Sequence, residues 1–276
     1  MYQALSSRFG RGAPMLRSAT PLTDDQIRAV APSIFAADPH HSRSARYTYI
    51  PTIDVLTGLR REGFEPFMVC QTRTRRLDRR EYTKHMIRMR YAGQIAGAEA
   101  NEIILLNSHD GSSAYQMLAG MFRFVCANGM VCGETLGDVR TPHKGDVIGQ
   151  VIQGAFTVLD SFERADEARE SMKAVQLPAG ADRALAAAAL TLRYDDADAA
   201  PIRADQLLTA RRIEDRGNDL WRTFNRVQEN AIRGGLQGRN ANGQRHTTRP
   251  VQGIDQNVKL NRALWVLAEE MRRLAA

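Results

Sequence analysis

The sequence predicts an α+β protein whose N-terminal part is mainly an antiparallel β-sheet with basic hairpins and whose C-terminal half is helical. Apolar and polar residues alternate with period two in segments between residues 64 and 125, as in strands with one buried face. After residue 152 the apolar residues recur with a period of 3.6, which is typical of helices. With 43% hydrophobic and 25% charged residues, the composition is that of an ordinary globular protein.

The 276 residues suffice for one large unit or for two halves that share an interface. Residues 1–22 are rich in Ser, Gly, Arg and Pro and show no periodicity, so we expect a flexible arm. Residues 23–152 form the β-rich basic half, and residues 153–276 form the helical half. We expect the helical half to pack on the first as one unit.

Two helices are predicted before the first long strand. Thr23-Asp24-Asp25-Gln26 has the form of a capping box and predicts a helix over about 24–31. Residues 47–50 suit a strand. The apolar residues that follow share one side of a helix, and Gly63 ends that helix.

The strands follow in sequence order. β-formers from 64 to 75 and from 83 to 91 predict two strands joined by a charged turn, which make a basic hairpin. Residues 102–107 contain four consecutive apolar side chains and predict a strand that is covered on both faces. Strand character continues from 115 to 125.

Asn128-Gly129 is a strong hairpin sequence, because both residues accept positive φ angles. If these two residues form the turn, Cys126 and Cys132 lie on opposite faces of the sheet and do not form a disulfide. A third cysteine, Cys70, has no partner in CxxC spacing, so the sequence suggests neither a disulfide framework nor a thiolate zinc site.

The second half of the chain has five segments with helical periodicity, at 155–175, 182–194, 203–212, 219–232 and 255–274. Between the last two, residues 234–245 are rich in Gly, Asn and Arg. This segment is long enough to be functional or disordered.

The positive charge is concentrated in particular segments. The chain carries a formal charge of +7, and residues 60–90 contain ten Arg or Lys against four acids. Residues 233–249 add four arginines and no acid, whereas residues 160–205 contain ten acids against six bases. Local clusters of one sign attract polyanions, so the pattern favours a nucleic-acid partner.

The strand predicted at 84–91 carries the main candidate site. Alternation places Lys84, Arg88 and Arg90 on one face, with a spacing of roughly 6.5 to 7 Å that is comparable with successive phosphates of a single strand. Tyr82 and Tyr91 flank this strand and could stack on unpaired bases. The other interpretation is a solvated edge whose charges oppose aggregation. Further phosphate-binding candidates are Arg73, Arg75, Arg233, Arg239 and Arg245.

The loop after the buried strand is a second candidate. Asn107, His109 and Asp110 bring an amide, an imidazole and a carboxylate into one loop. A hydrogen-bonded structural turn is favoured over a catalytic site, because a nuclease would need several carboxylates for its metal. His85 lies on the apolar strand face and is interpreted as a core histidine.

The residues from about Tyr47 to Ala268 resemble phage- and plasmid-like proteins that are classed as a domain of unknown function. The resemblance is carried by Asn107-Ser108-His109-Asp110-Gly111, by Arg123-Phe124-Val125-Cys126-Ala127-Asn128-Gly129, and by the tryptophan-containing segments 220–230 and 261–265. It implies an origin on mobile genetic elements, and it implies no catalytic residues.

The first functional hypothesis is a protein that binds single-stranded DNA, for annealing or for protection, without catalysis. No cofactor is needed and no metal site is expected. The alternatives are a protein-interaction or anti-defence factor and, third, a metal-dependent nuclease centred on His109 and Asp110. The N-terminus lacks the continuous apolar region of a signal peptide, and the longest apolar run, residues 184–192, is too short for a membrane span, so we expect a cytoplasmic protein; a homo-oligomer is compatible with this sequence.

Overall fold

The computed structural model describes residues 5–6, 14–43, 47, 49–94, 97–124, 128–132, 139–141, 147–194 and 199–275. The chain divides into two compact units. Unit 1 comprises Met1–Met130 and Thr135–Phe162, and unit 2 comprises Val131–Glu134 and Glu163–Ala276. The division at residue 162 comes later than the predicted boundary at 152 and lies inside a long helix, α3 (Val147–Ala174).

Unit 1 is built on an eight-stranded sheet in which the first seven strands follow one another in chain order. The pairs with a defined register, from β1–β2 to β5–β6 and β6–β8, are antiparallel. The antiparallel N-terminal sheet and the α+β class are therefore confirmed. The strands are β1 (Leu5–Ser6), β2 (Met15–Arg17), β3 (Phe64–Gln71), β4 (His85–Tyr91), β5 (Glu99–Asn107), β6 (Tyr115–Arg123), β7 (Asn128–Val131) and β8 (Val139–Thr141).

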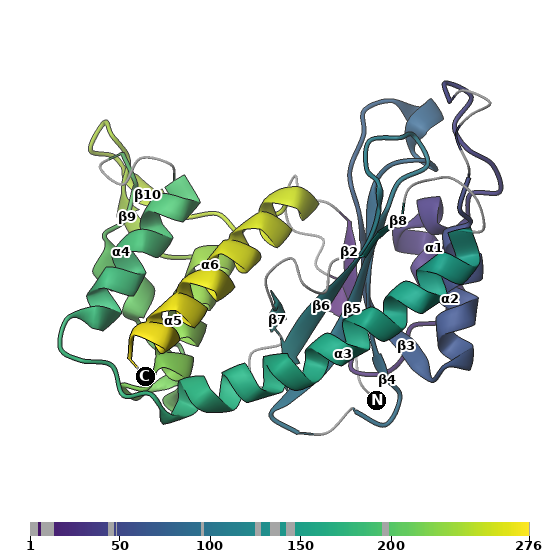
Figure 1. The fold of residues 1–276 in the computed structure, drawn as a ribbon. Helices are drawn as coiled ribbons and strands as arrows, with labels where there is room; N and C mark the ends of the chain where they lie inside the picture. The colour runs from purple at the N-terminus through teal and green to yellow at the C-terminus, as the bar shows by residue number, and fades with distance from the viewer. Residues whose placement is uncertain are drawn as a thin grey trace. The chain divides into compact units, whose positions relative to one another are not determined.

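Helices cover one face of this sheet (Figure 1). They are α1 (Asp24–Val30), α2 (Thr52–Arg61) and the first part of α3, and the predicted capping box of Thr23 and Gln26 is present at the start of α1. The core of unit 1 joins apolar side chains of the helices to those of the central strands, among them Ile27, Leu56, Ile87, Ile103, Met117 and Val158. Burial of each such side chain contributes about 1.5–3 kcal/mol.

Unit 2 is mainly helical, as predicted. Its elements are the last part of α3, α4 (Ala181–Tyr194), α5 (Leu220–Arg233), α6 (Ile254–Leu274), the 3₁₀ helices η5 (Ala204–Leu208) and η6 (Ile213–Asp215), and the short strands β9 (Gln237–Arg239) and β10 (Arg245–Thr247). Trp221, Phe224 and Trp265 pack edge to face or stacked between α5 and α6, with ring centroids 5.7–6.4 Å apart. Among the described helices, none is both long and apolar enough to cross a membrane.

The arm predicted at residues 1–22 is corrected in its last part. Met15–Arg17 form β2 and pair with β3, and Leu16 and Leu22 are buried. The segment is short and lacks visible periodicity, but an open edge of a sheet binds a short strand through its backbone groups alone. Residues 1–4 and 7–13 lie outside the described part.

Three other predictions about local structure are wrong. Tyr47, Tyr49 and Ile50 belong to no strand, because they fasten a connection to the rest of unit 1: the Tyr47 hydroxyl donates to the Ser108 carbonyl, and Ile50 is fully buried. The segment predicted as a helix at 203–212 contains η5 and extended residues. The disordered alternative for 234–245 is wrong as well, because β9 and β10 form a hairpin there.

Asn128 and Gly129 do not form the expected two-residue turn. Both belong to β7, and Gly129 does not have a positive φ angle. A β-carbon on Gly129 would lie 2.4 Å from the guanidinium carbon of Arg88, and one on Gly120 would lie 2.9 Å from an Arg88 nitrogen. These glycines therefore make room for a buried arginine. Cys126 lies outside the described residues, and Cys70 is a buried free thiol.

We expect Gly129→Ala to lower the free energy of unfolding by about 1–3 kcal/mol, because the added methyl group overpacks the space that the Arg88 guanidinium occupies. Gly93→Ala is the matched control, since a β-carbon there has no neighbour within 4 Å. Urea unfolding of both variants checks the prediction. Equal stabilities of the two variants would contradict it.

Candidate functional site

The exposed basic surface of unit 1 is the segment that joins β3 to β4, residues 72–84, which we call the basic loop. It contains six basic and two acidic residues. Arg73, Arg75 and Arg80 are exposed, and no described carboxylate forms an ion pair with them. Arg76 is also exposed but pairs with Asp78 at 2.8 Å. The loop therefore presents guanidinium groups that can take other anions.

The basic loop is firmly attached at both ends. The side-chain amide of Gln71 donates to Thr83 Oγ1 at 2.9 Å, and that hydroxyl donates to the Thr72 carbonyl at 3.0 Å. The backbone carbonyl of Tyr82 accepts from the amides of His109 and Asp110 at 2.9 and 3.1 Å. Because both ends are held, the arginines between them are displayed on a defined support rather than on a loose chain.

The predicted basic face of β4 is wrong in its main part. Lys84 is half-buried at the end of the loop, but Arg88 and Arg90 are only 3% and 1% exposed. The alternation itself is present. What is wrong is the predicted exposure of this face to solvent. Glu102 of β5 faces the same side of the sheet, and its two carboxylate oxygens accept from Arg88 Nε at 2.5 Å and from Arg90 Nε at 2.8 Å.

Arg90 is also packed between aromatic rings. Its guanidinium carbon lies 3.6 Å from the centroid of Phe122 and 4.6 Å from that of Phe67. Burial lowers the pKa of Arg90, and the carboxylate of Glu102 partly opposes this shift. Arg88 and Arg90 are therefore structural groups within the sheet, and neither reaches a phosphate from solvent.

The two tyrosines have different positions. Tyr82 is half-buried at the end of the basic loop, and its ring meets His40 edge to face with centroids 5.1 Å apart. Tyr91 is 36% exposed and packs on Phe64, but it lies at the far end of β4. The strand separates the two tyrosines by roughly 20–30 Å at 3.3 Å per residue, so they do not flank one site.

A buried polar row lies beneath the start and end of the basic loop. Gln71, His85 and Asn107 are direct cross-strand neighbours on β3, β4 and β5. Ser33 Oγ lies 2.8 Å from His85 Nδ1, and Thr52 Oγ1 lies 3.0 Å from His85 Nε2. Burial, reinforced by the nearby His109, lowers the pKa of His85 well below its usual value. His85 is thus a neutral core histidine with both ring nitrogens in hydrogen bonds.

The loop after β5 is the hydrogen-bonded turn that the sequence favoured. Asn107 and His109 are fully buried, and the Asn107 amide donates to Thr52 Oγ1 at 3.0 Å. The Asp110 carboxylate accepts from the Ser112 amide at 3.0 Å, and Gly111 has φ +75°. Among the residues that the structure describes, no three His, Cys, Asp or Glu side chains are grouped as metal ligands.

The β9–β10 hairpin of unit 2 carries the second set of candidates. Arg239 and Arg245 are directly opposite each other in the register, and both are exposed. Like charges placed opposite each other destabilise a hairpin, so an anion that bridges them would stabilise it. Arg233 is different, because it pairs with Glu229 at 2.7 Å.

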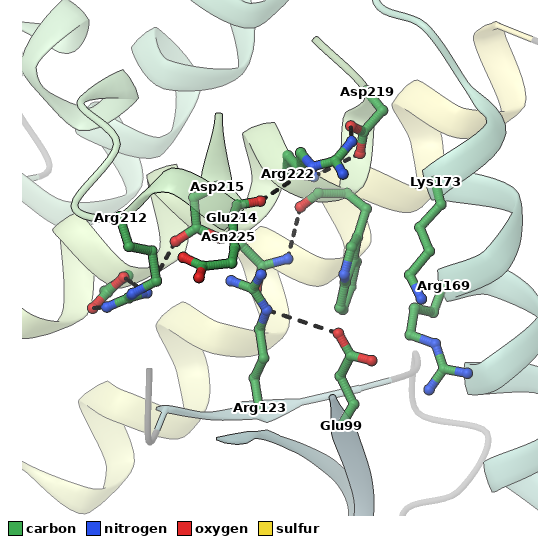
Figure 2. A network of polar contacts seen from close by, with 12 residues as sticks. Glu99, Arg123, Arg169, Lys173, Arg212, Glu214, Asp215, Asp219, Arg222 and Asn225 are labelled. Atoms are coloured by element: carbon green, nitrogen blue, oxygen red, sulfur yellow. Dashed lines mark hydrogen bonds and ion pairs between the residues drawn. The ribbon is translucent and has the colours of Figure 1, made fainter. Parts of the chain in front are cut away.

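The polar residues of α5 fasten the preceding segment to the helix. Arg212 of that segment pairs with Glu229 of α5 at 2.7 Å. Figure 2 shows two further ion pairs: Arg212 with Asp215, at 2.9 Å within the segment itself, and Arg222 of α5 with Asp219, at 2.7 Å. The Asp219 carboxylate also caps α5 by accepting from the Arg222 amide. Arg226 donates to the carbonyls of Asp215 and Gly217, so these charges hold structure together.

Two features were missed at the sequence level. Glu102 is the acid that pairs with Arg88 and Arg90, and its parity with the apolar Ile104 and Leu106 was the available sign that it is buried. The register, which places Ile104 opposite Arg88, puts Glu102 on the same side of the sheet as the arginines. Ser33 and Thr52 are the other omission, and no local pattern marks them as partners of His85.

Comparisons with known proteins place the chain in a family. Residues 39–265 match the family described as a domain of unknown function, DUF932, and the chain belongs to it. It is 58% identical to the UPF0380 protein YfjQ and to the UPF0380 protein YafZ, both of Escherichia coli strain K12, over 267 residues that cover 97% of this chain and 97% of each relative. No solved structure matches the chain.

Replacement of Glu102 by Gln should lower the free energy of unfolding by about 3–5 kcal/mol, because two buried arginines lose their common counter-ion. Asp24→Asn serves as the control: it breaks the more exposed pair with Arg60, in which Asp24 and Arg60 are 51% and 24% exposed, and we expect about 0–1 kcal/mol. Denaturant unfolding compares the two. A loss for Glu102→Gln as small as that of the control would show that Arg88 and Arg90 do not depend on this carboxylate.

His85 should make the protein less stable in mild acid. The pKa of His85 is lowered in the folded state, whereas an unfolded histidine has a pKa of about 6.5, so below this pH the unfolded state binds a proton that the folded state does not. Stability that is present at neutral pH is therefore lost as the pH falls below about 6.5, by up to about 1.4 kcal/mol per pH unit.

The measurement is the free energy of unfolding at several pH values between 7 and 5. His85→Gln should show a shallower dependence than the wild type, whereas His41→Gln, at an exposed position, should keep the wild-type slope. A ring nitrogen NMR spectrum that shows a protonated His85 in the folded protein at pH 6 would contradict the assignment.

Proposed function

We propose that this protein binds single-stranded DNA through the basic loop, with the β9–β10 hairpin as a second contact. One observation carries the proposal: Arg73, Arg75 and Arg80 are exposed on a loop that is fastened at both ends, and no described carboxylate neutralises them. Exposed guanidinium groups on a defined support attract and orient phosphates.

The burial of two arginines on β4 supports this proposal, because it excludes the strand as the phosphate-binding surface. Arg88 and Arg90 are buried inside the sheet and share the carboxylate of Glu102, so the proposal places phosphate binding on the loop rather than on the strand. Tyr82 is the aromatic residue of the basic loop, and it lies at the end of the loop, where an unpaired base of the bound strand can contact it. The proposed activity is binding, for annealing or protection of the strand, and it requires no bond to be broken.

The cellular setting belongs to the same proposal. The resemblance to phage- and plasmid-like proteins favours DNA, because mobile elements pass through single-stranded intermediates when they replicate or move. A cytoplasmic location is supported by the free thiol of Cys70, which fits a reducing compartment.

We expect the triple variant Arg73→Gln, Arg75→Gln, Arg80→Gln to bind a single-stranded oligonucleotide roughly tenfold more weakly at moderate salt, because phosphate contacts are lost. The plot of log affinity against log salt should also become less steep by about 2, since each phosphate contact on a single strand contributes about 0.7. Fluorescence anisotropy over a salt series measures both quantities.

The control removes the same charge elsewhere. Arg61, Arg164 and Arg183 are exposed and lie outside the basic loop, and their triple replacement by Gln should change the slope far less. Wild-type affinity that does not depend on salt, or equal effects of the two triple variants, would refute binding through the basic loop.

A further inference from the structure

A cavity of about 340 Å³ opens beside the end of the basic loop. Three segments of unit 1 line it: α1, the 3₁₀ helix η1 (Pro32–Phe35) with the residues after it, and the loop itself. The side chains that the argument uses are Arg28, Phe35, Asp38, Glu81 and Tyr82. This volume is near the lower end of the range for small-molecule pockets, about 300–1,000 Å³, and suits one flat ring system.

The cavity is adjacent to the proposed phosphate contacts. Glu81 and Tyr82 follow Arg80 directly in the chain, so a strand held on the exposed arginines passes the mouth of the cavity. The backbone of Tyr82 is fixed by the amides of His109 and Asp110, which makes this wall of the cavity rigid.

The charges of the lining select the kind of group that enters. Arg28 supplies one cation, while Asp38 and Glu81 supply two carboxylates, and both of these are exposed at the mouth. A phosphate is repelled by this net negative lining, whereas a group with N–H donors is attracted to the carboxylate oxygens. The cavity therefore complements the basic loop, because it repels the group that the loop attracts.

The lining also offers flat surfaces. The guanidinium carbon of Arg28 lies over the Phe35 ring, 3.9 Å from its centroid, so the cation contacts an aromatic face. Arginine planes and aromatic rings are the surfaces on which unpaired bases stack. The ligand that fits this lining has N–H donors for the carboxylates and a flat ring that stacks on the side chains, and a nucleobase has both.

We infer that the cavity receives one unpaired base of the bound strand, and that guanine fits best. Guanine presents two neighbouring N–H donor groups to a carboxylate, cytosine and adenine each present one amino group, and thymine presents a single N–H between two carbonyls that the carboxylates repel. This inference rests on the proposed function and adds a base preference to it.

The test compares two oligonucleotides of equal length, an oligothymidine and the same strand with guanine at every fourth position. The wild-type protein should bind the guanine-containing strand at least about fivefold more tightly, because a well-placed carboxylate contact discriminates by about 1 kcal/mol or more. The double variant Asp38→Asn, Glu81→Gln should lose this preference and bind the two strands equally. Because it also removes two negative charges beside the basic loop, it should bind oligothymidine at least as tightly as the wild type does.

The control variant Glu62→Gln, Glu163→Gln removes two exposed acids outside the cavity and should keep the preference. Free guanosine at equimolar concentration should not displace the strand, because it lacks the phosphates that the basic loop holds. Displacement of the strand by guanosine would overturn the inference that the cavity is part of a strand-binding site.

The two proposals fail in different ways. Equal affinity of the wild-type protein for both oligonucleotides, or a preference that survives in the Asp38→Asn, Glu81→Gln variant, would overturn the base pocket and leave strand binding intact. Absence of salt-dependent binding to either strand would overturn the proposed function and the pocket together.

Discussion

The ion pairs of Glu102 with Arg88 and Arg90 are the constraint on which the arrangement of unit 1 depends. Two guanidinium groups with almost no exposure need a counter-ion inside the sheet, and the carboxylate of Glu102 pairs with both of them. One Arg88 nitrogen donates to the Met130 carbonyl on β7, and Gly129 and Gly120 leave the space that the guanidinium occupies. These contacts tie β4, β5, β6 and β7 together through one side chain.

Side chains on the opposite face of the same strands hold the basic loop in position. The row of Gln71, His85 and Asn107 lies under the two ends of the loop, and its hydrogen bonds to Ser33 and Thr52 join the sheet to η1 and α2. These hydrogen bonds favour one arrangement of loop, helix and sheet, because breaking them would leave buried polar groups without partners. The same anchoring gives the cavity beside Tyr82 a rigid wall, and it links the core of unit 1 to the proposed DNA contacts.

Most of the fold could be predicted, because the elements carry their own local causes. The capping box at Thr23 and Gln26, the amphipathic pattern of α2 and the period-two pattern of β4 act over a few residues and are visible in the sequence. The predictions were wrong where the local structure depends on contacts with residues that are distant in the sequence. The strand β2 exists because the edge of β3 was available, and the segment at 203–212 follows the surface of α5 instead of forming a helix of its own.

The sequence by itself determined the class of the fold, the alternation of faces along β4 and the concentration of arginine between residues 60 and 90, because these properties depend on residue type and spacing. Only the tertiary structure decided which of those arginines meet solvent. Burial depends on what lies across the sheet, and Glu102 is brought beside Arg88 and Arg90 by strand pairing rather than by nearness in the chain. For that reason the basic loop, and not the strand, is the proposed phosphate-binding surface.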